Sequence, residues 1–178
     1  EDIFDLLERH HDDVDYVVHM GAVTSTTETD ADLIVQTNYR LPQTLWEWCA
    51  HHEVPFLYAS SAATYGDGSA GFDDDGSPEA LARLVPLNAY GWSKHAFDRW
   101  VARQVADGAD APPQWVGLKF FNVYGPNEWH KGAMMSGVTR AWPAVSRGEP
   151  VTLFRSHHPD YADGEQMRDF VYVKDCVD

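Results

Sequence analysis

The sequence predicts an α/β protein with a doubly wound sheet of parallel strands and helices on both faces. Short apolar runs rich in β-branched residues alternate along the chain with longer segments of helical periodicity. The connections between these runs are longer than hairpin turns, which favours parallel strands joined by crossovers. Of the 178 residues, 44% are hydrophobic, so the chain can bury a normal core.

The first half of the chain supplies two expected strands and one helical segment. Residues 14–19 are a β-branched run that ends before a glycine, as in a buried strand. Apolar residues recur with helical spacing over residues 31–52, and Pro42 predicts a kink or a restart of this helix near Asn38. Residues 54–59 predict a second buried strand.

The middle of the chain predicts a loop, an insertion, a helix and a third strand. Residues 60–66 are expected to form the loop that leaves the second strand. Residues 67–85 are acidic, rich in glycine and without period, which indicates a surface insertion. Asn88 is typical of an N-cap for a helix that continues to about Val105, and residues 115–121 predict a strand.

The last third predicts shorter elements. Residues 122–126 are expected to form a loop, and residues 134–145 a helix that is broken or kinked at Pro143. Residues 151–154 and 170–173 predict two further short strands.

Composition excludes several classes of function. The chain carries 28 acidic and 13 basic residues, a net charge of −15 that disfavours a nucleic-acid partner. Cys49 and Cys176 form neither a CxxC pair nor a metal-binding spacing, as expected of reduced thiols in a cytoplasmic protein. Apolar runs are shorter than the roughly 18 to 20 residues that a membrane span needs, so we expect no membrane partner. The sequence opens at Glu1 without Met, and we interpret it as an internal part of a longer protein.

Gly66-Asp-Gly-Ser-Ala-Gly71 matches the pattern GxGxxG of dinucleotide-binding loops. Such a loop must lead from a strand directly into a helix whose N-terminal amides face the phosphates. Three consecutive aspartates, residues 73–75, follow here instead. We therefore interpret the match as a flexible acidic loop.

The residues that could perform chemistry lie on the predicted helix after Asn88. Tyr90 and Lys94 are four residues apart, so both side chains lie on one helix face, where a cation favours the ionised phenol. Alone, this spacing is more typical of an exposed amphipathic face. Ser60 and Ser61, however, follow the second strand at the sheet edge where parallel sheets bind ligands, although turn or helix capping is the common role of such serines.

These residues resemble a known family. Ser61 followed by Tyr90-xxx-Lys94 is similar to the catalytic trio of the extended short-chain dehydrogenase/reductase family, the sugar-nucleotide epimerases and dehydratases. Three more segments resemble motifs of that family in the same order: the cofactor-side strand end at 18–22, the substrate-side signature at 121–126 and the late strand at 168–173.

The resemblance implies a Rossmann-type fold without its first βαβ unit, because the family's glycine-rich loop precedes everything in this sequence. It divides the chain into a partial NADP-binding domain, residues 1–126, and the start of a substrate-binding portion, residues 127–178, with a strand near 169–173. It also implies a homo-oligomer, activity only in the complete protein, and NADP as cofactor with NAD as the alternative.

Within this family, dehydratases carry an Asp-Glu pair after the strand-end hydroxyl. Ala62 and Ala63 stand there, which disfavours dehydration. Residues 25–28, 58–66 and 128–132 resemble the members that invert C6″ of ADP-heptose for lipopolysaccharide synthesis. A UDP-sugar 4-epimerase of the same family and a non-catalytic nucleotide-binding module remain alternatives.

The resemblance also assigns roles to residues. Tyr90 and Lys131 would each serve one orientation of the sugar as acid and base. Lys94 would orient the cofactor ribose, and Ser61 would hold the substrate oxygen. Besides Tyr90 and Lys94, the cofactor would contact Met20, Gly21, Ala22, Val23, Thr24, Asn38 and Val123. Besides Ser61, the substrate would contact Asn122, Ala133, Arg140, Phe154, Arg155, Ser156, His157 and Arg168.

Two of these positions, Ala133 and Arg140, depart from the serine and histidine of the family pattern. We expect no metal site, because adjacent histidines on a helix point about 100° apart and rarely share one ion. The histidine pairs are at residues 10–11, 51–52 and 157–158.

Overall fold

The computed structural model describes residues 2–157 and 159–177, except for the side chain of Ala133. The chain divides into two compact units, of which the first ends at Lys119 and the second begins at Phe120. The functional boundary expected after residue 126 stays a prediction.

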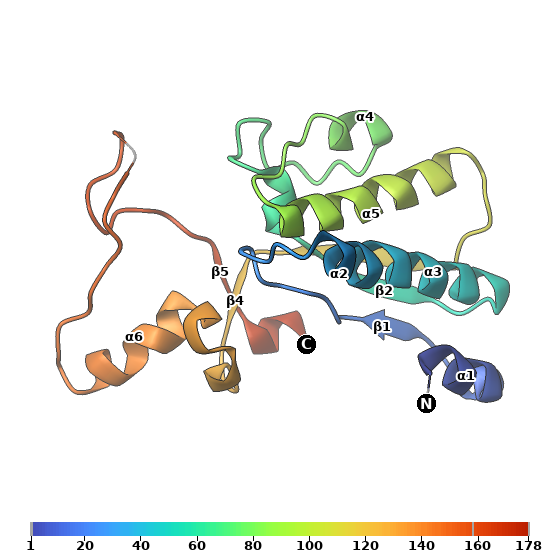
Figure 1. Cartoon of the computed structure of the whole chain (residues 1–178), viewed down its shortest axis with the longest axis horizontal. Helices are drawn as coiled ribbons and strands as arrows, with labels where there is room; N and C mark the ends of the chain where they lie inside the picture. Colours follow the sequence, from blue (N-terminus) through green and yellow to red (C-terminus); the bar gives the residue numbers. More distant parts are fainter. Residues whose placement is uncertain (1, 158, 178) are drawn as a thin grey trace. The chain divides into compact units, whose positions relative to one another are not determined.

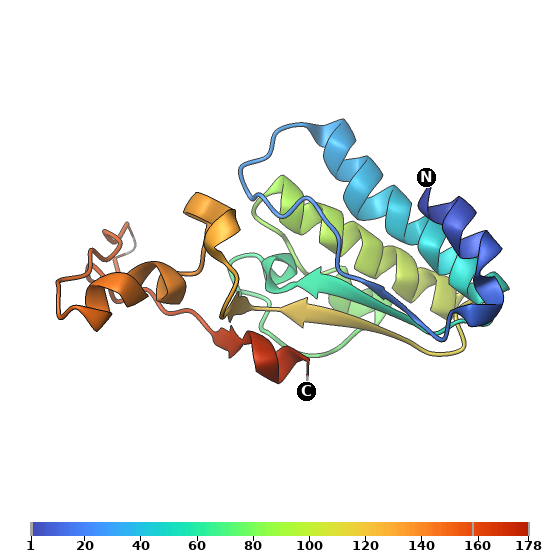
Figure 2. The ribbon, with the colours of Figure 1, turned by 90° about the horizontal axis from the view of Figure 1, so that it is seen from below.

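A three-stranded sheet forms the centre of the first unit, with the strands in the order β1 (Val17–His19), β2 (Phe56–Ser61) and β3 (Trp115–Phe120). β1 and β2 are parallel, with Val17 opposite Phe56. Figure 2 shows β3 running in the same direction as β2. The predicted parallel sheet is confirmed.

The bounds of the first two strands differ from the prediction. The backbone N–H of Val17 donates to the carbonyl of Pro55 at 2.9 Å, and Pro55 has no N–H to continue the ladder toward residues 14–16. β1 is therefore shorter than expected. β2 runs on through Ser60 and Ser61, so the expected loop begins only at Ala62, with a 3₁₀ turn over Ala62–Tyr65.

The long helical segment is one helix with a widened turn. α2 (Ala31–Val35) continues through a π-helical turn (Gln36–Arg40) into α3 (Leu41–His51). Pro42 lies directly after the widened turn, and because it has no N–H it cannot take part in the regular hydrogen-bond ladder there. The irregularity predicted near Asn38 is confirmed, and it takes the form of a π-bulge, a feature frequent at functional sites.

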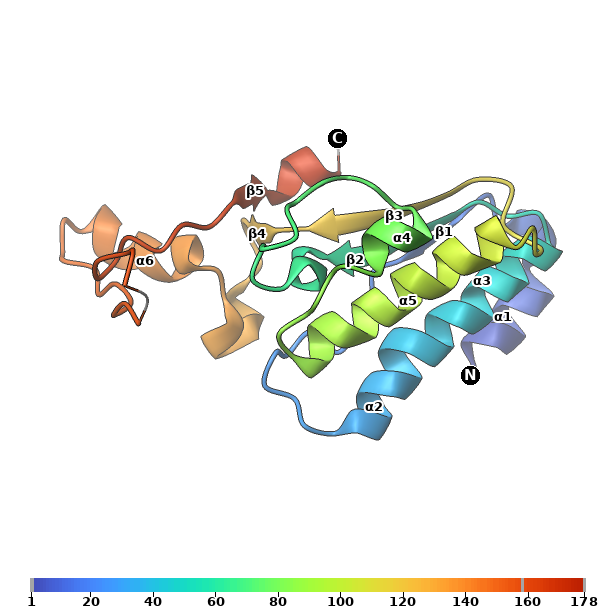
Figure 3. The ribbon, with the colours of Figure 1, turned by 90° about the horizontal axis from the view of Figure 1, so that it is seen from above.

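The helix predicted after Asn88 is α5 (Ala89–Ala106). The Asn88 side chain accepts a hydrogen bond from the backbone N–H of Gly91 at 2.8 Å, so the predicted N-cap is confirmed. The segment 67–85 is only partly a surface insertion, because it contains the short helix α4 (Pro78–Leu81). α4 packs against α5 and buries Ala80 and Leu81 (Figure 3).

The core of the first unit lies between the helices and one face of the sheet. Figure 1 shows α3 and α5 side by side along the sheet. Trp46 from α3, Phe56 from β2 and Phe97 from α5 are each at most 2% exposed. The Trp46 and Phe56 rings meet edge to face, with centroids 6.1 Å apart. A further helix, α1 (Ile3–Arg9), packs Phe4 and Leu7 against this core.

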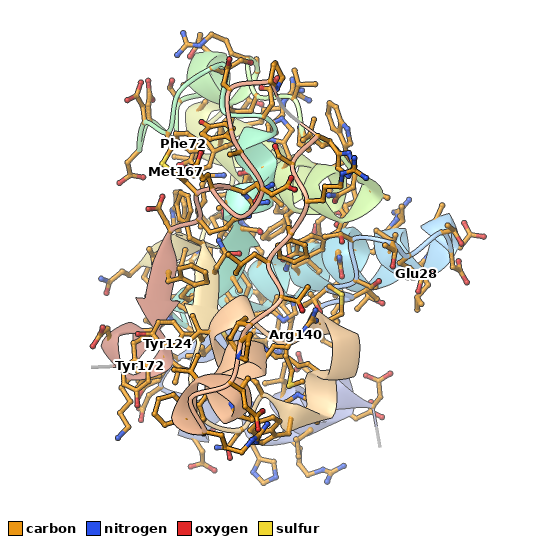
Figure 4. The ribbon with its side chains drawn as sticks, turned by 90° about the vertical axis from the view of Figure 1, so that its left-hand side faces the viewer. Glu28, Phe72, Tyr124, Arg140, Met167 and Tyr172 are labelled. Atoms are coloured by element: carbon orange, nitrogen blue, oxygen red, sulfur yellow. The ribbon has the colours of Figure 1, made fainter. Side chains whose placement is uncertain are left out.

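The second unit contains a two-stranded parallel sheet, β4 (Asn122–Tyr124) and β5 (Phe170–Tyr172), and the α-helix α6 (Gly137–Ser146). The late strand is confirmed, whereas the loop expected at 122–126 is wrong, because its first three residues pair with β5. Tyr124 and Tyr172 lie on these adjacent strands with ring centroids 5.4 Å apart (Figure 4).

Two other expectations for this unit are corrected. α6 starts later than residue 134, and it continues past Pro143, so the predicted break is wrong, while a kink at Pro143 stays a prediction. Residues 151–154 form no strand. A strand needs a partner strand, and the described backbone contact of these residues is one hydrogen bond, from the N–H of Gly164 to the carbonyl of Phe154 at 2.8 Å.

The cap of α5 is testable by substitution. Asn88→Ala removes the acceptor for Gly91 and should lower the free energy of unfolding by about 1 kcal/mol. Denaturation by urea, followed by tryptophan fluorescence, measures this change. Asn88→Ser keeps a capping oxygen and should retain most of the stability, so equal losses in the two variants would contradict the cap.

Candidate active site

Lys94 is anchored at the carboxyl end of β2. Its ammonium donates to the carbonyl of Ala59 at 2.9 Å, and the residue is 5% exposed. Burial lowers the pKa of Lys94 to about 8, and the nearby carboxylate of Asp98 opposes this shift. The cation is therefore held two residues before Ser61, at the sheet edge where parallel sheets bind ligands.

Tyr90 lies one turn before Lys94 and is half-buried. The first turn of α5 sits very close to the 3₁₀ turn that follows Ser61, since a Cβ on Gly91 would lie 2.8 Å from the carbonyl oxygen of Ala63. Only glycine permits this approach. The structure thus brings the three predicted residues Ser61, Tyr90 and Lys94 to one end of β2 and α5.

Ser61 also caps the turn that follows it. Its hydroxyl oxygen accepts a hydrogen bond from the backbone N–H of Ala63 at 3.1 Å. The capping role considered for this serine is therefore real, but it uses an oxygen lone pair and leaves the O–H as a donor. Capping and a contact to substrate are compatible at this residue.

Asn38 connects the loop after β1 to α5. The residue is 1% exposed, and its side chain accepts from Val23 N–H at 2.8 Å and donates to the Val23 carbonyl at 2.9 Å. It also donates to the hydroxyl of Ser93 at 3.0 Å, and that hydroxyl donates to the carbonyl of Tyr90 at 2.7 Å. One buried amide therefore fixes the predicted cofactor segment against the helix of Tyr90.

The predicted cofactor segment itself is open. Met20, Gly21 and Thr24 are exposed, and Ala22 and Val23 are half-buried. A Cβ on Gly21 would meet one side-chain atom, of His19, at 4.0 Å. Small residues with an accessible backbone at the carboxyl end of a parallel strand fit a dinucleotide, and the ribose hydroxyls suit the Lys94 cation.

Asp98 accepts hydrogen bonds from two strands and was not predicted. It lies one turn after Lys94 and is 6% exposed. It accepts from the hydroxyl of Ser60 at 2.7 Å and from that of Tyr58 at 3.2 Å. Lys119 of β3 forms an ion pair with the same carboxylate and donates to Thr64 at 2.9 Å. The sequence did offer a signal for this contact, because Asp98 follows Lys94 by four residues on the predicted helix and therefore lies on the same face.

His19 is a second residue that sequence reasoning missed. It ends β1, is 8% exposed, and its Nε2 has no hydrogen-bond partner among the described residues. Burial, followed by the charge of Lys94, lowers the pKa of His19 to about 4. The ring is therefore neutral at pH 7.

The GxGxxG match is not a phosphate loop. Gly66, Gly68 and Gly71 have φ values of 67°, 79° and 86°, and they form turns. Gly66 is required by packing, because a Cβ there would lie 2.0 Å from the carbonyl oxygen of Val85. The next helix, α4, begins only at Pro78, which agrees with the interpretation as an acidic loop.

Lys131 belongs to the second unit. It is exposed in a 3₁₀ segment, Trp129–Met134, that is interrupted at Gly132 with φ 53°. Asn122 and Val123 lie in β4, and the Asn122 side chain donates to the carbonyl of Asp169 at 3.0 Å.

The remaining predicted substrate residues also lie in the second unit. Arg140 is exposed on α6, and Arg168 is exposed and donates to the Met167 carbonyl at 2.7 Å. Ser156 is half-buried, and its backbone N–H donates to Asp163 at 2.7 Å. Three more are exposed and lie outside helices and strands: Phe154, Arg155 and His157. The side chain of Ala133 lies outside the described residues.

Over residues 2–157 and 159–177, no three histidine, cysteine or acidic side chains are grouped so that they could hold a metal ion. Within the same ranges, no helix has the length and apolar character to cross a membrane.

Comparison with known proteins places this geometry in a family. The NAD dependent epimerase/dehydratase family matches residues 1–178. The ADP-L-glycero-D-manno-heptose-6-epimerase of Fusobacterium nucleatum is 51% identical over 167 residues, which are 94% of this chain and 49% of that protein. The chain thus spans about half the length of the curated relatives it matches.

Solved structures show the same fold. A crystal structure of ADP-L-glycero-D-manno-heptose-6-epimerase from Helicobacter pylori has a TM-score of 0.77 and 33% identity, covering 97% of this chain and 49% of that one. The UDP-glucose 4-epimerase of Thermus thermophilus, in complex with NAD, has a TM-score of 0.68 and 26% identity, covering 98% of this chain and 55% of that one.

The pKa of His19 predicts a pH dependence of stability. Between pH 4 and the ordinary pKa of 6.5, the unfolded state binds more protons than the folded state, so the free energy of unfolding falls as the pH drops through this range. At about 1.4 kcal/mol per pKa unit, the full loss is about 3 kcal/mol. Urea denaturation at a series of pH values measures it.

His19→Asn should reduce the slope of this part of the pH profile, and His95, whose pKa burial also lowers, accounts for part of the slope that remains. His10→Asn, which replaces an exposed histidine, is the matched control variant. A wild-type slope retained in His19→Asn would show that His19 does not titrate as described.

Proposed function

The chain belongs to the NAD dependent epimerase/dehydratase family, and on that premise we propose that it forms about half of an ADP-heptose 6-epimerase. That enzyme would convert ADP-D-glycero-β-D-manno-heptose to its L-glycero epimer for the lipopolysaccharide core. The observation that carries the proposal is the buried, anchored Lys94 beside Tyr90 and Ser61. The 51% identity to a heptose 6-epimerase over nearly the whole chain supports the substrate.

Oxidation at C6″ is the task of the first unit. Ser61 donates its free O–H toward the substrate oxygen, and Tyr90 takes the proton of the C6″ hydroxyl as hydride leaves that carbon. Lys94 would orient the cofactor ribose, and the carboxylate of Asp98 raises the pKa of Lys94 against the lowering by burial. When bound, the nicotinamide supplies the hydride acceptor for oxidation and the hydride donor for reduction.

Reduction from the opposite face needs a second proton donor. Inversion requires the 6″-ketone to turn its other face toward the same hydride source, and this moves the oxygen away from Tyr90. Lys131 would donate the proton to that oxygen. The hydride taken from C6″ is returned to it, the proton taken by Tyr90 is replaced by one from Lys131, and proton exchange with solvent resets both side chains. An exposed lysine on a short 3₁₀ segment can meet a substrate without crowding.

The cofactor of this family is an NAD-type dinucleotide, and we propose NADP for this chain. Support for NADP over NAD comes from the resemblance to heptose epimerases. Met20 to Thr24 would lie against the dinucleotide, with Asn38 holding Val23 in place. Over residues 2–157 and 159–177, no GxGxxG sequence leads from a strand directly into a helix. We therefore propose that catalysis needs the complete protein, and that this protein is a cytoplasmic homo-oligomer.

The remaining substrate contacts are assigned to the second unit. Asn122 would contact the sugar, Val123 the cofactor, and Arg168 the diphosphate, for which a guanidinium is suited. Other substrate contacts would come from Ala133, Arg140, Phe154, Arg155, Ser156 and His157.

The substrate is testable directly. With the complete protein and NADP, NMR at C6″ should show inversion of ADP-heptose, whereas UDP-galactose should remain unchanged. Turnover of UDP-galactose alone would contradict the proposal and favour a UDP-sugar 4-epimerase. Binding of NADP without turnover of either sugar would favour a non-catalytic module.

The two-base chemistry predicts a large effect of Lys131→Met. Loss of one proton donor should slow epimerisation by roughly 10²- to 10⁴-fold. The binding of NADP, measured by quenching of tryptophan fluorescence, should be retained. Lys174→Met replaces an exposed lysine of the same unit and should epimerise at the wild-type rate. Unaltered epimerisation by Lys131→Met would rule out a second base at this position.

A further inference from the structure

Glu128 is a buried carboxylate in the second unit that none of the assigned roles uses. It is 5% exposed. One oxygen, Oε1, accepts from the backbone N–H of Gly125 at 2.8 Å and from the hydroxyls of Ser136 and Thr139 at 3.0 and 2.9 Å. The other, Oε2, accepts from the backbone N–H of Ser136 at 2.8 Å.

These hydrogen bonds keep the carboxylate ionised. Burial raises the pKa of Glu128, but the hydrogen bonds from Ser136, Gly125 and Thr139 outweigh it, so that the pKa lies below its ordinary value. A carboxylate is acceptor-only and can satisfy four donors at once. A glutamine could not, because its NH₂ group would face donors.

The contacts join two rigid elements around one segment. Gly125 follows β4, whereas Ser136 and Thr139 form the first turn of α6, with Ser136 as its N-cap. Between them lies the 3₁₀ segment of Lys131, whose backbone N–H donates to the Glu128 carbonyl at 2.9 Å. Glu128 therefore holds both ends of the Lys131 segment.

Apolar packing contributes little to holding this segment. Its two largest apolar side chains, Trp129 and Met134, are 60% and 50% exposed. Gly132 adds conformational freedom directly after Lys131. The buried carboxylate is thus the main described contact that fixes the path of the backbone at Lys131.

We propose that Glu128 is the positioning residue for Lys131, fixing the segment from which that lysine reaches one orientation of the sugar. This inference rests on the proposed function, since it assigns Lys131 to one of two half-reactions. A misplacement of about 1 Å can slow a reaction by about 10²-fold. Loss of the Glu128 contacts should therefore affect the half-reaction of Lys131 and spare that of Tyr90.

The test compares the two half-reactions in Glu128→Gln. The complete protein, loaded with oxidised NADP, is mixed in single turnover with each C6″ epimer of ADP-heptose separately, and the absorbance of reduced nicotinamide is followed. Oxidation of one epimer should slow by roughly 10- to 100-fold, and oxidation of the other should stay within about twofold. Lys131→Met should slow the same epimer, and Glu149→Gln, an exposed acid of the same unit, should slow neither.

Hydrogen exchange without substrate or cofactor gives a second measurement. In Glu128→Gln, the backbone amides of Gly125, Lys131 and Ser136 should exchange faster, while those of α5 should keep the wild-type rate. Faster exchange across both units would show general destabilisation and overturn the positioning role.

The outcomes separate the two proposals. If the wild type oxidises neither epimer, the proposed function fails and this inference fails with it. If the wild type and Lys131→Met behave as expected but Glu128→Gln slows both epimers equally, or neither, only the role of Glu128 is overturned.

Discussion

The buried carboxylate of Asp98 is the contact on which the arrangement of the first unit depends. It accepts from Tyr58 and Ser60 of β2 and pairs with Lys119 of β3, so one side chain of α5 is bonded to two strands. A charge in the interior is tolerated only when it is paired and hydrogen-bonded. The helix can therefore occupy one position along the sheet, and Lys94, one turn earlier, reaches the end of β2.

A buried carboxylate also joins separate segments in the second unit. Glu128 ties the end of β4 to the start of α6, as Asp98 ties α5 to the sheet. Each carboxylate satisfies donors from separate segments, and each leaves the neighbouring lysine, Lys94 or Lys131, at a defined place. Asn38 adds a neutral counterpart, because its amide joins the loop after β1 to α5. The buried side chains of Asp98, Glu128 and Asn38 thus hold in place the segments that carry the proposed functional residues.

The sequence predicted what depends on local spacing. The N-cap at Asn88, the common face of Tyr90 and Lys94, and the irregular turn near Asn38 follow from neighbours along the chain, and all are present. Contacts between distant residues were missed, such as that of Asp98 with Lys119 and the burial of His19. The strand expected at 151–154 is wrong for the same reason, since an apolar run does not identify a partner strand.

A double-mutant cycle at Asp98 and Lys119 tests the central claim most directly. Asp98→Leu and Lys119→Met are compared, singly and together, by the free energy of unfolding. Each single substitution leaves a buried charge without its partner and should cost about 3–5 kcal/mol. The double variant should cost clearly less than the sum of the two single losses, although Tyr58 and Ser60 still lack their acceptor. Losses below about 1 kcal/mol that simply add would contradict the account, because they are typical of an exposed pair that holds nothing in place.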